Sequence, residues 1–112
     1  MTTPEEFLGE AIVESHAMDY DHETLVAIRK RFRPDTWQSP RETAESRKGL
    51  CRDFAMFAIA RAWELCGGLP PPAELVLVCG HLSEAQRDAD VWHAWVELVP
   101  GNGPKLWAEA TP

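Results

Sequence analysis

The sequence predicts an α+β fold in which helices come first and a small antiparallel sheet follows. Two observations carry this prediction. Segments up to residue 66 place their apolar residues at helical spacing, whereas AELVLVCG (73–80) and VWHAWVELV (91–99) are rich in β-branched and aromatic residues. A chain whose helical and strand segments are segregated in this way is typical of the α+β class.

Three helices are expected before the central one. TPEEFLGEAIVESH is interpreted as a helix that begins at Thr3, because a proline and two glutamates suit a first turn. A second helix is expected over about 22–32, ending before the next proline. SPRETAES carries the capping-box pair Ser39 and Glu42, and this short helix is expected to end at Gly49.

The central helix is predicted from Leu50 or Cys51 to about Leu65. Its apolar residues cover most of the circumference, which indicates a largely buried helix. CGGLPPP should end it, with Gly67 or Gly68 as the left-handed cap and the prolines preventing continuation.

Three strands are predicted after this helix, over 73–80, 91–99 and KLWAEA (105–110). The linker PGNGP (100–104) is typical of a hairpin turn, and the polar segment 81–90 is expected to be a loop. We therefore expect the central helix to pack on an antiparallel sheet.

The 112-residue chain is predicted to form one domain, residues 1–112, with a helical N-terminal part over 1–36 and a catalytic-type core over 37–112. The net charge of −7 argues against a nucleic-acid groove and against an anionic membrane surface as partner. No segment has the roughly 18 apolar residues of a membrane span. The acidic N-terminus lacks the order of a signal peptide, and we expect a cytoplasmic protein.

The three cysteines form neither a CxxC pair nor an even-numbered disulfide framework, so we expect no metal and no cofactor. Cys66 and Cys79 are interpreted as buried space-fillers. Cys51 differs, because it lies in the first turn of the central helix. There the unpaired N–H groups and the helix dipole, helped by Arg52 and Lys48, are expected to lower the pKa of the thiol. Glycine before Cys51 should let the chain turn sharply, so that the sulfur faces a cleft.

A thiolate nucleophile needs an imidazole partner, and His93 is the strongest candidate. Alternation puts His93 and Trp95 on one face of their strand and Ala94 and Val96 on the other. An imidazole in a strand that is apolar on both sides is costly without a partner. A satisfied core histidine and a catalytic base both fit this pattern. The remaining three histidines are expected at the surface.

The third requirement is a group that orients the imidazole. Glu109 shares a face with Lys105 and Trp107, and the short turn before this strand should bring it beside the strand of His93. An orienting carboxylate and a solvated glutamate near the end of the chain remain alternatives.

The motifs KGLCRDFA, WHAWVEL and WAEATP resemble, in order and spacing, those of the transglutaminase-like superfamily. The segment WQSPRETAESRKGLCRDFA is similar to the start of bacterial transglutaminase-like cysteine proteinases, and the resemblance covers about residues 37–112. It implies a papain-like fold with a Cys–His–Asp type triad. That triad falls on Cys51, His93 and Glu109, with glutamate where aspartate is usual.

The resemblance also implies an upstream side-chain N–H, from Trp37 or Gln38, that helps to bind the oxyanion. Trp37 as a loop residue packed on the core is the alternative. Trp95 is expected in the core and the cleft wall, and Asp53 is expected to serve structure at the helix start.

These residues predict a cysteine-dependent acyl transfer or hydrolysis at an amide of a peptide or protein substrate, through a thioester. The alternative is a non-catalytic peptide- or protein-binding module that keeps the fold. A purely structural domain of a larger assembly is a third possibility.

Overall fold

The chain folds as α+β with a small antiparallel sheet, as the sequence predicts. The structure, a computed structural model, describes residues 3–67, 73–89, 91–100 and 104–112. The helices are α1 (Pro4–His16), α2 (His22–Arg29), α3 (Pro40–Ser46), α4 (Cys51–Leu65) and α5 (Glu84–Asp88). The strands are β1 (Asp19–Tyr20), β2 (Lys48–Gly49), β3 (Ala73–Gly80), β4 (His93–Pro100) and β5 (Leu106–Ala108).

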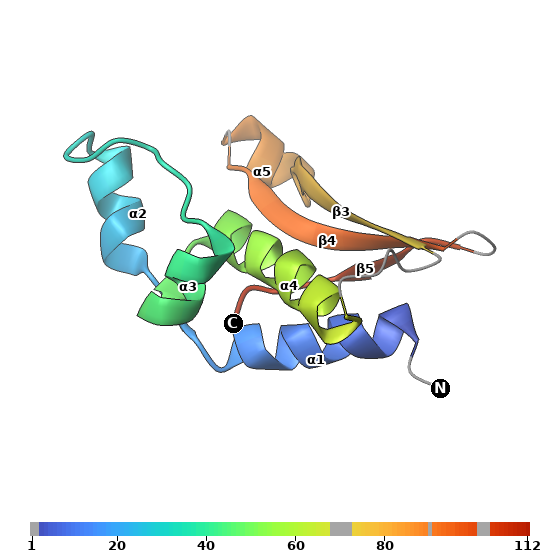
Figure 1. Cartoon of the computed structure of the whole chain (residues 1–112). Coiled ribbons are helices and arrows are strands. Elements are labelled where there is room, and N and C mark those ends of the chain that lie inside the picture. Colours follow the sequence, from blue (N-terminus) through green and yellow to red (C-terminus); the bar gives the residue numbers. More distant parts are fainter. Residues whose placement is uncertain (1–2, 68–72, 90, 101–103) are drawn as a thin grey trace.

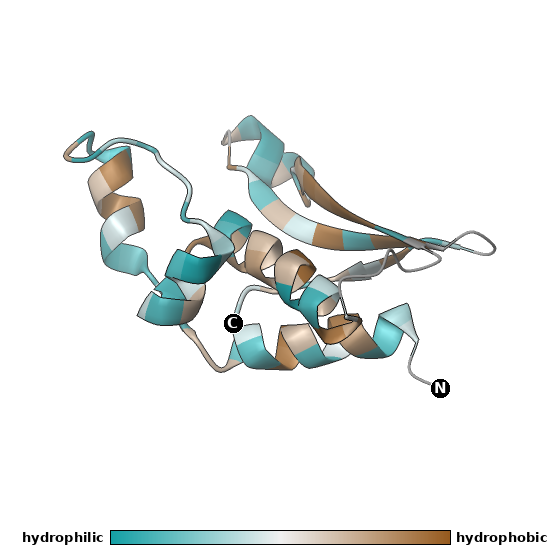
Figure 2. Cartoon of the chain, in the orientation of Figure 1, coloured by the Kyte–Doolittle hydropathy of each residue, from teal (hydrophilic) through white to brown (hydrophobic). Residues whose placement is uncertain are grey.

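Helix α4 lies between the three-stranded sheet and α1 (Figure 1). The sheet has the order β3-β4-β5 with both pairs antiparallel, and β1 pairs with β2 in parallel. In Figure 2 the hydrophobic colour gathers on β3, whereas α3 is mainly hydrophilic. The buried core joins side chains from α1, the turn after it, α4, β4 and the C-terminal segment: Leu8, Ala11, Met18, Phe54, Ala55, Phe57, Ala58, Ala62, Ala94, Val96, Leu98 and Ala110.

The predicted alternation of β4 is confirmed. Ala94, Val96 and Leu98 are at most 2% exposed and belong to the same core cluster as the buried face of α4. Burial of Val96 and Leu98 contributes roughly 1.5–3 kcal/mol each. His93 and Trp95 occupy the opposite face and keep partial exposure. The site histidine is therefore held at the first residue of a strand whose other face anchors it to the core.

Local signals at the helix starts act as expected. The Thr3 side chain accepts a hydrogen bond from the Glu6 backbone N–H at 3.3 Å. Ser39 and Glu42 form a reciprocal capping box with distances of 3.1 Å in both directions. The left-handed cap after α4 is Gly67, with φ +79°, while its alternative Gly68 lies outside the described residues.

Two helix ends were placed wrongly from the sequence. Helix α2 ends at Arg29 rather than near residue 32, because Arg31 takes a left-handed φ of 61° and the Phe32 N–H turns back to the Ala27 carbonyl at 2.8 Å. Helix α3 ends before Gly49, because Arg47 takes a left-handed φ of 57°. Arginines rather than proline or glycine end these helices.

The segment between β3 and β4 was predicted to be a loop, but it contains the short helix α5. The Ser83 side chain accepts a hydrogen bond from the Gln86 N–H at 3.2 Å and starts this short helix. Strand β5 spans three residues, fewer than predicted, and the short strands β1 and β2 were not predicted from the sequence. The predicted hairpin turn falls largely on residues 101–103, outside the described part of the chain.

The junction between β2 and α4 is organised by Asp53, which is 2% exposed. Its carboxylate accepts hydrogen bonds from the backbone N–H groups of Leu50 and Gln38, both at 2.9 Å. The structural role expected of Asp53 is thus confirmed. A Cβ at position 49 would lie 2.9 Å from Asp53 Cβ and 3.2 Å from the Gln38 side-chain nitrogen.

Gly49 is therefore required for space, not for the sharp turn that the sequence suggested. Among the described glycines, only Gly67 has a left-handed φ. Gly49 and Asp53 pack together, and Cys51 lies between them in the sequence. This packing fixes the position of Cys51 at the start of α4.

We expect Gly49→Ala to lower the free energy of unfolding by roughly 1–3 kcal/mol, because the added methyl group overpacks the Asp53 cap. Urea denaturation followed by circular dichroism measures this change.

Gly9→Ala is the matched control. A Cβ at this position in α1 meets no atom within 4 Å, so the substitution should instead stabilise the protein by about 0.5–1 kcal/mol. Equal effects of the two substitutions would contradict the packing argument.

Candidate active site

Cys51 is the first residue of α4, and its sulfur lies beside the start of β4. The first intrahelical hydrogen bond runs from the Phe54 N–H to the Leu50 carbonyl at 3.1 Å. The backbone N–H groups before Phe54 in the first turn therefore have no intrahelical acceptor. The thiol interacts with the backbone N–H groups of Arg52 and Ala94. Since Ala94 follows His93 directly, the helix start and the strand start meet at this sulfur.

His93 is paired with Glu109. His93 Nε2 lies 2.5 Å from Glu109 Oε2, across 16 residues of sequence. An ionised carboxylate only accepts hydrogen bonds, so Nε2 carries the proton and Nδ1 is left to exchange a proton with a nucleophile. The orienting contact predicted for Glu109 is present in the structure.

The backbone around Glu109 is held by the end of α1. Ser15 Oγ donates to the Ala110 carbonyl at 2.8 Å, and the His16 ring nitrogen lies 2.7 Å from the Glu109 carbonyl. Glu109 Oε1 also accepts from the Thr111 backbone N–H at 3.1 Å. These contacts order a carboxylate near the end of the chain, and nothing in the sequence near Ser15 and His16 signals them.

Cys51 and His93 line one cavity of about 540 Å³. Tyr20, Trp37, Arg52 and Thr111 line it as well, together with residues of α2 and of the segment before β4. Tyr20 and Thr111 were not identified as site residues from the sequence. They lie 31 residues before and 60 residues after the cysteine (51 − 20 and 111 − 51), and only the fold brings them to it.

The electrostatics of Cys51 differ from the sequence-based expectation. Burial raises the pKa of the thiol above its ordinary value, the N–H groups of Ala94 and Arg52 oppose this rise, and the negative charge of Glu109 adds to it. The expected lowering of the pKa by the helix start is therefore wrong for the resting site, because desolvation outweighs the dipole. Formation of a thiolate here requires a base that accepts the proton.

The three residues assigned to the cleft have different surroundings. Trp37 lines the cavity, is 44% exposed, and its ring lies 5.1 Å from the guanidinium carbon of Arg52. The Gln38 amide nitrogen donates to the Lys48 carbonyl at 3.1 Å, and Gln38 is not among the described residues that line the cavity. Trp95 stacks on the His93 ring with centroids 6.3 Å apart, and it is not among the described residues that line the cavity.

The other two cysteines differ from the buried space-fillers that were expected. Cys79 is exposed and lines the cavity, and Cys66 is half-buried with its sulfur donating to the Trp63 carbonyl at 3.2 Å. Cys79 occupies the end of β3 opposite Ala94, where the sheet edge opens toward solvent. Reactivity at Cys51 must therefore be measured separately from reactivity at Cys79.

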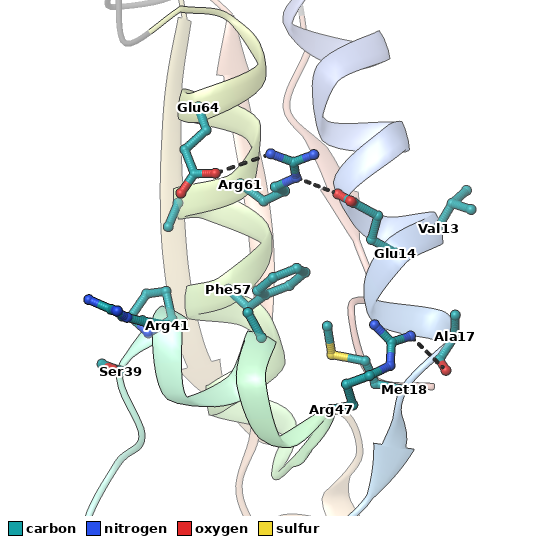
Figure 3. A pocket seen from close by; sticks show the side chains of 13 residues that line it. Val13, Glu14, Ala17, Met18, Ser39, Arg41, Arg47, Phe57, Arg61 and Glu64 are labelled. Carbon is teal, nitrogen blue, oxygen red and sulfur yellow. Dashed lines mark hydrogen bonds and ion pairs between the residues drawn. The ribbon is translucent and has the colours of Figure 1, made fainter.

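A larger cavity of about 860 Å³ lies between α1, α3 and α4, away from these residues (Figure 3). Arg61 crosses it with ion pairs to Glu14 at 2.7 Å and Glu64 at 3.1 Å, and Arg47 donates to the Ala17 carbonyl. Neither a cysteine nor a histidine is among its described lining residues. The ion pair of Arg61 with Glu14 joins α1 to α4. The candidate reactive residues Cys51 and His93 line the smaller cavity instead.

In the described part of the chain, no group of three or more His, Cys, Asp or Glu side chains is arranged to hold a metal ion. Across the same residues, no helix has the length and apolarity to cross a bilayer. Comparison of the chain with protein-family models, curated proteins and solved structures finds no match in any of the three.

Glu109→Gln is expected to weaken the hydrogen bond at His93 Nε2. A short, charge-assisted bond deshields its proton strongly, so the ring N–H resonance of His93 should lie far downfield in the native protein and move upfield in the variant. Proton NMR of the imidazole region measures this.

Glu97→Gln is the control, since Glu97 lies on the same strand face but approaches Lys105 at 4.0 Å. It should leave the His93 resonance in place. If Glu109→Gln leaves the resonance unmoved, the pair is not formed in solution.

Proposed function

We propose that the chain is a cysteine-dependent acyl-transfer enzyme that acts on an amide of a peptide or protein, with Cys51 as nucleophile, His93 as proton carrier and Glu109 as orienting carboxylate. The observation that carries the proposal is the 2.5 Å contact between His93 and Glu109, because it leaves the opposite ring nitrogen for Cys51. The shared cavity and the contact of the sulfur with the backbone of Ala94 support it.

The finer fold assignment belongs to the same proposal. The order of a cysteine at a helix start, a histidine on the following sheet and a carboxylate on the next strand resembles the transglutaminase-like superfamily. The antiparallel pairing of β4 with β5 supports this likeness. It places Glu109, the residue after β5, beside the strand β4 that begins with His93. We infer a papain-like arrangement of α4 and the sheet.

The reaction begins with attack of the Cys51 sulfur on the amide carbonyl carbon, while the thiol proton passes to His93 Nδ1. His93 then gives this proton to the amide nitrogen, the C–N bond breaks, and a thioester and a free amine remain. Water or an amine attacks the thioester in the second half and gives its proton to His93. The Cys51 sulfur leaves and is reprotonated.

His93 has to act as a base in the first step, because burial raises the pKa of the thiol at rest. Glu109 stabilises the imidazolium that forms. Its longer side chain, compared with aspartate, is accommodated by the bond of its second oxygen to the Thr111 N–H.

A non-catalytic module that binds a peptide in the same cavity is the second candidate. The raised pKa of Cys51 favours it, since a protonated buried thiol is a poor nucleophile. The two candidates differ in whether His93 activates Cys51.

The pH dependence of Cys51 alkylation by iodoacetamide tests this difference. In the native protein we expect alkylation near neutral pH, since His93 accepts the thiol proton. In His93→Asn, alkylation at pH 7 should fall by about tenfold or more and recover only above the ordinary pKa of cysteine, near 8.5. Site-resolved mass spectrometry reports each cysteine.

Cys66 labelling in the same samples serves as the internal reference and should not change. Superimposable Cys51 profiles for the native protein and His93→Asn would favour the binding module over the enzyme.

A further inference from the structure

The lining of the cavity carries an excess of positive charge in a chain whose net charge is −7. Two arginines, Arg29 and Arg52, and one carboxylate, Asp35, line it. Glu109, which is hydrogen-bonded to His93, is not among the described residues that line the cavity. A positive cavity wall in an acidic protein concentrates anions at that place.

Arg52 is already neutralised. Its guanidinium is paired with Asp35, donates to the Thr36 carbonyl at 3.4 Å, and lies against the Trp37 ring. Its side chain is only 16% exposed. The hydrogen bond from Arg52 also lowers the pKa of Asp35, as expected of a formed ion pair.

Arg29 has no such partner. It lies in the last turn of α2, is exposed, and its guanidinium forms neither an ion pair nor a hydrogen bond with any residue in the described ranges. Among the described lining residues, Arg29 is therefore the positively charged side chain that no ion pair neutralises.

Tyr20 interacts electrostatically with both Arg29 and Cys51, the proposed nucleophile. Burial raises the pKa of this phenol, Cys51 raises it further, and the charges of Arg29 and Arg52 lower it. One side chain therefore lies within electrostatic range of both arginines and of the reactive sulfur. The phenol, the free guanidinium and the thiol border the same space.

We propose that this cavity binds an acyl donor that carries a carboxylate close to the reacting carbonyl group, and that Arg29 recognises the carboxylate. The proposal rests on the acyl-transfer function above. A guanidinium binds a carboxylate through two parallel hydrogen bonds, and one free arginine matches its single charge. A doubly charged phosphate would carry one negative charge more than Arg29 neutralises. Trp37 and Trp92 supply aromatic walls for the rest of the donor.

The test compares two small alkylating agents of nearly equal size, anionic iodoacetate and neutral iodoacetamide. The readout is the ratio of their rate constants at Cys51, divided by the same ratio for N-acetylcysteine. The thiolate fraction affects both agents equally, so this normalised ratio reports charge recognition alone.

We expect the normalised ratio to exceed one in the native protein and to fall about twofold to fivefold in Arg29→Gln, the range of a solvent-exposed ion pair. Arg29→Lys should retain most of it. Lys30→Gln removes the same charge one residue away, outside the described cavity lining, and should leave the ratio unchanged.

Protection of Cys51 from iodoacetamide distinguishes the two sources of a carboxylate. N-acetylglutamate amide presents only a side-chain carboxylate, and N-acetylglutamine presents only a terminal one. The compound that slows Cys51 alkylation more strongly identifies whether the donor presents a side-chain or a terminal carboxylate. Its protection of Cys51 should be lost in Arg29→Gln.

A normalised ratio of one or less, or a ratio that Arg29→Gln does not change, overturns the carboxylate proposal while leaving the enzyme proposal intact. Failure of both agents to label Cys51 at neutral pH, with labelling at Cys79, overturns both.

Discussion

The buried carboxylate of Asp53 is the constraint on which the rest of the site depends. A charge at 2% exposure is tolerated only when it is fully hydrogen-bonded. The required donors come from Leu50, at the start of α4, and from Gln38, 15 residues before Asp53. This single group therefore joins the segment before α3 to the helix that begins at Cys51. It also excludes a side chain at Gly49, which explains why a glycine stands two residues before Cys51.

The second half of the site is held from the opposite end of the chain. The contacts of Ser15 and His16 with the backbone at 109–110 cross more than 90 residues of sequence. Helix α1 thereby positions the carboxylate that orients His93, although no residue of α1 lines the cavity. The N-terminal part and the core share one hydrophobic cluster, and Tyr20 and Arg29 contribute cavity wall. Described residues of the N-terminal part thus help to build the site.

Two physical effects compete at Cys51. The start of a helix favours an anion, while removal of the thiol from water favours the neutral form. Desolvation is the larger effect here, and the nearby charge of Glu109 acts in the same direction. The carboxylate that orients the imidazole therefore opposes the thiolate directly and favours it only through His93. In the proposed reaction, the thiolate therefore forms by proton transfer to His93 and is not permanently present.

Short-range signals in the sequence determined much of the fold. The capping box at Ser39 and the start of α4 at Cys51 depend on residues within a few positions of one another, and so does the alternation around His93. Local chemistry can therefore predict them. The short connection between their strands made a contact of His93 with Glu109 one of two expectations, beside a solvated glutamate, and the structure forms the contact. The left-handed arginines that end α2 and α3 left no local signal, because arginine has no preference for that conformation.

Only the tertiary structure decided the surroundings of these residues. Desolvation of Cys51, the engagement of the Gln38 amide with the Lys48 carbonyl and the meeting of Tyr20, Arg29 and Arg52 at one cavity all depend on segments far apart in the chain. Burial and electrostatic environment are sums over such neighbours. Sequence spacing could therefore identify the candidate reacting groups, while the packing of the fold set the pKa of the thiol and the charge of the cavity wall around it.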